Sequence, residues 1–174
     1  MKTFFTIITC AWLLLSATPH DLQAKSKHDP IVGVWLQNQR PAGDSELILA
    51  AQAIFNADGT VSRNLDPDLQ RVLGPPEFPE GTVFSISDDY SEWERVSKHC
   101  YKCVGTQIVL IKNLDGTFTP LARAKCEINL SVHGKNMTGR ETLSFYDYYD
   151  LTLTVPFLGL PTLEFVIEGR KLQT

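Results

Sequence analysis

The stretch Thr117–Val132 constrains the fold more than any other part of the chain. Apolar or small side chains occupy its even positions, from Phe118 to Val132, and polar side chains occupy most of its odd positions. Alternation with a period of two indicates a β-strand with one dry face and one wet face. The stretch is longer than an ordinary strand, so we expect it to bend, as long strands do when a sheet curls into a barrel.

The inward face predicted for this strand carries small side chains at Ala122 and Ala124. Small inward residues leave space inside a barrel, and pockets in barrel mouths combine apolar walls with a few polar groups. We therefore predict that a small molecule binds inside. The residues expected to line its site are Arg95, Tyr101, Gln107, Phe118, Ala122 and Ala124.

Two loops of the same form, Asn56–Thr60 and Asn113–Thr117, read Asn-x-Asp-Gly-Thr. A type I turn followed by glycine at positive φ is the usual connection of a tight antiparallel hairpin. The first loop favours a strand over a helix for the apolar run 46–55. A further hairpin is expected between 137–146 and 149–155. Because we find no convincing long helix, we predict an all-β, single antiparallel up-and-down barrel of about eight to ten strands.

The second loop also sets a register between its two strands. If Lys112 faces Thr117, then Cys103 faces Cys126. Facing residues on adjacent antiparallel strands lie within disulfide reach when the pair is not hydrogen-bonded. We predict a Cys103–Cys126 disulfide, and a bulge at Gly116 would shift this register by one residue.

The remaining cysteine of the barrel, Cys100, leaves alternatives open. It could pair with Cys126 instead, and together with His99 the three cysteines offer four possible zinc ligands. Redox Cys-x-x-Cys pairs open a helix in thioredoxin-type folds, whereas this pair precedes a predicted strand. We therefore prefer a structural disulfide and expect no metal and no cofactor.

The N-terminus has the pattern of a secretory signal. A charged start precedes the apolar run Phe4–Leu15, which is too short to anchor stably in a bilayer. We expect cleavage after Ala24, with Ala17 as the alternative. The predicted division is a signal peptide at 1–24 and one barrel domain at 25–174, in a secreted or periplasmic protein.

Composition narrows the range of partners. The chain has 16 Lys and Arg against 20 Asp and Glu, a net charge of −4, and no basic run. Such a chain is a poor nucleic-acid binder. No apolar stretch after the N-terminal run approaches a membrane span. We therefore expect a possible small hydrophobic ligand, no nucleic acid, no stable membrane span, and a monomer or weak dimer.

The segment 64–81 is rich in proline and glycine, which exclude regular structure for most of it. A loop of this length within a compact domain can be a lid over a binding site. It can equally be a solvated connection, and the sequence leaves both interpretations open.

Gly33-x-Trp35 in the first predicted strand, with Arg170 in the last, resembles the arrangement of lipocalins and calycins. That resemblance implies an early tryptophan that closes one barrel end beneath a late arginine, a cation–π contact worth about 1 kcal/mol. More closely, residues 31–172 are similar to small secreted bacterial lipocalin-like (calycin-type) β-barrel proteins of undefined function. The matching residues are Phe55-Asn56-x-Asp58-Gly59-Thr60, Trp93 ahead of Tyr101, Asp115-Gly116-x-Phe118, Gly139, and Glu168-Gly169-Arg170-x-Leu172.

Three functions are compatible with these features. The first is an exported barrel that binds a small apolar or amphipathic ligand in its interior without catalysis. The second is a barrel isomerase or cyclase that positions a lipid-like substrate in a dry cavity, which a buried carboxylate or a Tyr–Arg pair in that cavity would favour. The third is a protein-interaction module with a filled barrel, which uses the tyrosine-rich segment 145–150 or an outer face.

Overall fold

The computed structural model describes five stretches of the chain: 28–43, 47–65, 83–87, 89–113 and 115–172. The predicted signal peptide at 1–24 lies outside these residues. So does most of the predicted lid, the part from 66 to 81. The two predictions therefore stay predictions.

The described residues form nine β-strands and no helix. The strands are β1 (Gly33–Pro41), β2 (Leu49–Phe55), β3 (Thr60–Leu65), β4 (Val83–Ile86), β5 (Asp89–Arg95), β6 (Cys100–Lys112), β7 (Phe118–His133), β8 (Asn136–Asp147) and β9 (Leu163–Lys171). Eight of them close into an antiparallel ring in the order β6-β5-β3-β2-β1-β9-β8-β7, and β7 returns to β6. β4 is the extra strand and pairs with the last part of β6. The predicted all-β up-and-down barrel is confirmed.

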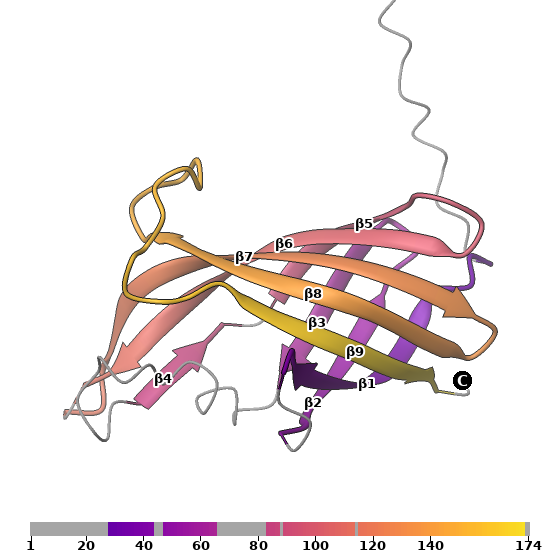
Figure 1. The fold of residues 1–174 in the computed structure, drawn as a ribbon, viewed down its shortest axis with the longest axis horizontal. Coiled ribbons are helices and arrows are strands. Elements are labelled where there is room, and N and C mark those ends of the chain that lie inside the picture. The colour runs from indigo at the N-terminus through magenta and orange to yellow at the C-terminus, as the bar shows by residue number, and fades with distance from the viewer. Residues whose placement is uncertain (1–27, 44–46, 66–82, 88, 114, 173–174) are drawn as a thin grey trace, which may run out of the picture.

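The two ends of the barrel differ (Figure 1). At one end, on the right in the figure, lie the turn from β7 to β8 and the end of β9, where the Lys171 N–H donates to the Lys135 carbonyl at 2.9 Å. At the other end β6 and β7 extend beyond the ring, β4 lies beside them, and the loop from β8 to β9 projects. The candidate site lies between these ends.

Both Asn-x-Asp-Gly-Thr loops form the predicted hairpins. The glycines adopt positive φ, 94° at Gly59 and 85° at Gly116. In each loop the aspartate carboxylate accepts a hydrogen bond from the backbone N–H two residues later, at 2.8 Å for Asp58 and 2.9 Å for Asp115. These local contacts explain why the sequence alone identified the turns.

The register of β6 against β7 departs from the prediction in two steps. The loop closes with Lys112 opposite Phe118, one residue later than expected. A β-bulge then inserts Leu121 between two successive pairs, which adds a second residue. As a result Cys126 lies opposite Gly105 rather than opposite Cys103.

The predicted Cys103–Cys126 disulfide is therefore wrong, and so is the alternative from Cys100. No disulfide joins the three cysteines of the described chain. Because the two shifts add up to two residues, Cys103 and Cys126 both keep their inward orientation and are both buried. They have become diagonal neighbours, and such positions lie about 7–8 Å apart, beyond disulfide reach.

The hairpin predicted between 137–146 and 149–155 is also wrong, because 149–155 forms no strand and β8 pairs with β7 and β9. The end of β8 meets the returning chain at an isolated antiparallel bridge between Tyr146 and Pro156. The later segment is a loop organised by Asp150. The Asp150 carboxylate accepts hydrogen bonds from the backbone N–H groups of Thr152, at 2.9 Å, and Val155, at 2.6 Å. The Thr152 hydroxyl, followed by these backbone donors, lowers the pKa of the Asp150 carboxyl. A side chain that takes up backbone donors in this way competes with strand pairing.

Candidate functional site

One end of the barrel is filled with aromatic side chains whose polar atoms have partners. The indole N–H of Trp35 donates to the Ile31 carbonyl at 2.7 Å, and that of Trp93 donates to the Asn56 carbonyl at 2.9 Å. Both indoles are at most 1% exposed. We call this region the Trp35 end; its residues are Asp29, Ile31, Trp35, Trp93, Tyr101 and Lys171.

Asp29 links the N-terminal segment to the Trp35 end through contacts with two side chains. Its carboxylate accepts a hydrogen bond from the Tyr101 hydroxyl at 2.6 Å and lies 3.4 Å from Nη1 of Arg95. Burial, and then the hydrogen bond to Asp29, raise the pKa of Tyr101. The predicted interior position of Arg95 is wrong, since its side chain is 41% exposed. Arg95 is the last residue of β5, so it covers the rim rather than lining the interior.

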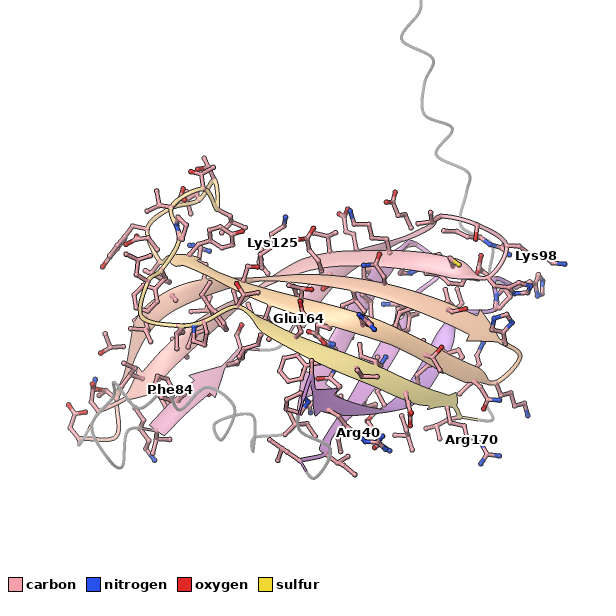
Figure 2. All side chains as sticks on the ribbon, in the orientation of Figure 1. Arg40, Phe84, Lys98, Lys125, Glu164 and Arg170 are labelled. Carbon is pink, nitrogen blue, oxygen red and sulfur yellow. The ribbon has the colours of Figure 1, made fainter. Side chains whose placement is uncertain are left out.

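The cation above Trp35 is Lys171, so the predicted contact from Arg170 is wrong. Nζ of Lys171 lies 5.6 Å from the centroid of the Trp35 ring and donates to the Pro30 carbonyl at 2.9 Å. Burial lowers the pKa of Lys171. Side chains alternate along β9, so Arg170 points away from the barrel (Figure 2). Gly33 makes room for the lysine, because a Cβ there would lie 2.8 Å from Cε of Lys171.

Farther from the Trp35 end, polar side chains enter the barrel interior. Five inward side chains on β1, β3, β6 and β8 are polar or charged and at most 3% exposed. These strands are distributed around the closed ring. We call the five residues the interior polar set: Gln37, Gln39, Arg63, Gln107 and Glu141.

Arg63 and Glu141 form an ion pair across the barrel. The two Nη atoms of Arg63 donate to the two carboxylate oxygens of Glu141, each at 2.5 Å. Their strands, β3 and β8, lie four positions apart in the eight-stranded ring, so the pair spans the interior. The Cys126 thiol donates to Oε1 of Glu141 at 3.0 Å and accepts from Nη2 of Arg63 at 3.3 Å. The two opposite charges thus neutralise each other inside the barrel.

The glutamines of the set differ from this pair, because each has at least one amide atom without a partner among the described residues. Gln107 is 1% exposed, and neither its Oε1 nor its Nε2 has a hydrogen-bond partner among the described residues. The same is true of Oε1 of Gln37 and Nε2 of Gln39. Buried polar groups nearly always have a partner, and each one without costs about 1–3 kcal/mol. A bound molecule, either water or a ligand, would complete these hydrogen bonds.

Four of the six predicted lining residues face inward: Tyr101, Gln107, Ala122 and Ala124, each at most 1% exposed. Gln107 lies opposite Ala124 across the β6–β7 pair. Tyr101 belongs to the Trp35 end, where Asp29 engages its hydroxyl. That these residues contact a ligand stays a prediction.

Phe118 is 49% exposed, so its predicted place in the lining is wrong. The inserted Leu121 reverses the faces of β7, because a shift of one residue moves every side chain to the opposite side. Phe118 precedes the insertion and pairs with exposed Lys112. The alternation in the sequence runs on through the bulge and therefore conceals it.

Four members of the interior polar set were not predicted: Gln37, Gln39, Arg63 and Glu141. Gln37, Arg63 and Glu141 each stand two residues from a buried apolar side chain, and Gln39 stands two residues after Gln37 on the same face of β1. One acid and one base at inward positions could have indicated a buried pair. The sequence does not show that β3 and β8 oppose each other, and so does not show that the two charges meet.

In the part of the chain that the structure describes, no group of three or more His, Cys, Asp or Glu could hold a metal ion. Nor does that part contain a helix long and apolar enough to cross a membrane. The sequence matches no protein-family model, no curated protein and no solved structure. The resemblance to lipocalin-like proteins therefore stays a prediction from the residues that carry it.

Proposed function

We propose that this protein is an exported barrel that binds a small amphipathic molecule in its interior without catalysis. The observation that carries the proposal is the amide of Gln107, which is buried with both polar atoms lacking a partner among the described residues. A ligand with a polar group would supply the missing hydrogen bonds. Small-molecule sites are typically apolar with a few polar groups that fix orientation.

Apolar side chains accompany these amides. They lie beside the interior polar set or beyond it from the Trp35 end. Ala124 lies opposite Gln107, and Phe165 lies opposite Glu141. Each is at most 4% exposed: Val109, Ala122, Ala124, Leu143, Phe145 and Phe165. Apolar surface of this kind suits the body of a ligand, while the amides suit its polar group. This combination supports an amphipathic ligand over a purely apolar one.

A buried carboxylate, Glu141, would favour an isomerase or cyclase, but its contacts favour binding. Arg63 donates to both of its oxygens, and Cys126 donates to one of them. A general base has to come within hydrogen-bond reach of the proton that it abstracts. A substrate would have to displace the guanidinium of Arg63 before it reached this carboxylate. We therefore assign Glu141 to the framework of the site.

Native mass spectrometry of protein purified from its own host tests the proposal. We expect a retained small molecule on the wild type, and its loss or marked reduction in Gln107→Leu. The matched control is Gln52→Leu, the same change at an exposed position of β2, which should keep the molecule. A wild-type protein that retains nothing, and that host extracts do not stabilise against heat, would contradict the proposal.

A further inference from the structure

We infer that the polar group of the ligand is uncharged and carries both a hydrogen-bond donor and an acceptor, as a primary amide or a lactam does. This inference rests on the proposed function and specifies the class of ligand. It follows from the kinds of atoms that lack partners and from the charge balance of the interior.

The unpartnered amide atoms of the three glutamines include both donors and acceptors. Nε2 of Gln39 and Nε2 of Gln107 are donors, while Oε1 of Gln37 and Oε1 of Gln107 are acceptors. A carboxylate has acceptors alone and would leave both oxygens unsatisfied, and an ammonium has donors alone and would leave both nitrogens unsatisfied. A group that both donates and accepts is the match.

Gln107 further narrows the class of polar group that the ligand can carry. Its donor and its acceptor sit side by side on one amide, and both lack partners, so either orientation of that amide presents the same two functions. The edge of a primary amide or lactam can donate to Oε1 and accept from Nε2 at the same time. A hydroxyl can make both bonds only through its single oxygen, which is a poorer fit to two adjacent atoms.

The charge balance excludes an anionic group. Arg63 is the one cation buried in the barrel among the described residues, and Glu141 neutralises it through two hydrogen bonds. A ligand carboxylate would therefore bring an uncompensated negative charge into the same interior as Glu141. Burial of a charge without a partner is far more costly than burial of a hydrogen-bonded neutral group.

The experiment compares decanamide, decanol and decanoate by isothermal titration calorimetry on the full barrel domain at neutral pH. The three probes share one alkyl chain, so differences in affinity report on the polar group. We expect decanamide to bind most tightly, about tenfold or more above decanoate, with decanol between them.

Variants of Gln107 test whether this residue causes the preference for decanamide over decanoate. Gln107→Leu should reduce the advantage of decanamide over decanoate to within about threefold, whereas Gln52→Leu should leave it unchanged. Gln107→Met keeps the length of the side chain and serves if the leucine variant does not fold. An advantage that persists in full in these Gln107 variants would overturn the assignment to this amide.

Two results separate the inference from the proposed function. If decanoate binds as tightly as decanamide or tighter, the uncharged class is wrong, but binding inside the barrel stands. If none of the three probes binds, the proposed function itself is overturned.

Discussion

The Trp35 end and the interior polar set bury polar atoms in two different ways. At the Trp35 end the indoles and the phenol donate to backbone carbonyls or to Asp29. In the interior polar set, Arg63 and Glu141 form an ion pair, and each of the three glutamines keeps at least one amide atom without a partner among the described residues. We therefore interpret the first region as framework and the second as the place for a ligand.

The backbone explains this difference. At the Trp35 end, turns and the N-terminal segment offer carbonyls that no strand uses, such as that of Ile31. Within the closed ring, strand N–H and C=O groups pair with neighbouring strands. A polar side chain inside the barrel can then bond to another side chain or to a bound molecule. Interior polar residues of closed barrels are for this reason informative about ligands.

The largest expected effect comes from breaking the ion pair of the interior polar set. Arg63→Met leaves the Glu141 carboxylate buried without its cation, which should lower the free energy of unfolding by about 3–5 kcal/mol. Urea denaturation measures this loss. The double variant Arg63→Met with Glu141→Leu should recover most of it, because an apolar pair of similar volume carries no buried charge.

The matched control is Arg40→Met, which removes a surface ion pair. Nη2 of Arg40 lies 3.6 Å from Oε2 of Glu168, and the side chains are 39% and 56% exposed. Surface pairs contribute about 0–1 kcal/mol, so this change should cost little. If Arg40→Met and Arg63→Met lowered the free energy of unfolding equally, the buried ion pair would contribute no more to stability than the surface pair.

A second expected effect concerns the Trp35 end. Trp35→Phe removes the indole N–H that donates to Ile31 and leaves a small cavity beneath Lys171. We expect the free energy of unfolding to fall by about 2 kcal/mol. Because this end is framework, probe affinities in the folded variant should match the wild type. A selective loss of decanamide binding would mean that the Trp35 end takes part in ligand binding and is not framework alone.

A smaller effect is expected from Tyr101→Phe, which removes the hydrogen bond to Asp29 and should cost about 1 kcal/mol at neutral pH. The pKa of Tyr101 is raised in the folded state. As the pH rises past about 10, the unfolded chain therefore loses the phenolic proton first, and the free energy of unfolding falls.

Phenylalanine cannot titrate, so the stability advantage of the wild type over Tyr101→Phe should shrink as the pH increases through that range. Denaturation at neutral pH and at several alkaline pH values gives this difference directly. The comparison also cancels most of the contribution of Lys171, whose own pKa is lowered by burial. A constant difference across the range would show that the hydrogen bond does not govern titration.

The smallest effect has the opposite sign. Gln107→Leu replaces a buried amide without partners by an apolar side chain, so the ligand-free protein should become more stable, by up to about 1 kcal/mol. Thermal or urea unfolding of delipidated protein measures this gain. Stabilisation of the empty protein together with loss of ligand is the expected sign of a binding residue. A large destabilisation would instead place Gln107 with the framework.

The parts of the fold that depend on residues close together in the chain could be predicted from the sequence. The alternation of β7 and the two Asn-x-Asp-Gly-Thr loops predicted strands, hairpins and an antiparallel barrel, and these are confirmed. Ala122, Ala124 and Gln107 were also placed on the inward face correctly. Each of these predictions needs a period of two or a turn motif, and both are visible within a few residues.

The alignment of the strands, and which of them oppose each other across the barrel, became clear only from the folded chain. One inserted residue, Leu121, turned Phe118 outward and helped to separate the two cysteines, and one step along β9 put Lys171 above Trp35. The meeting of Arg63 and Glu141 required the ring to close. The register of a strand pair depends on every residue from the turn onward, so one inserted residue moves all later side chains to the opposite face. Closure of the barrel brings together strands that are distant in the chain. Neither the register nor the closure can be read from a local sequence pattern.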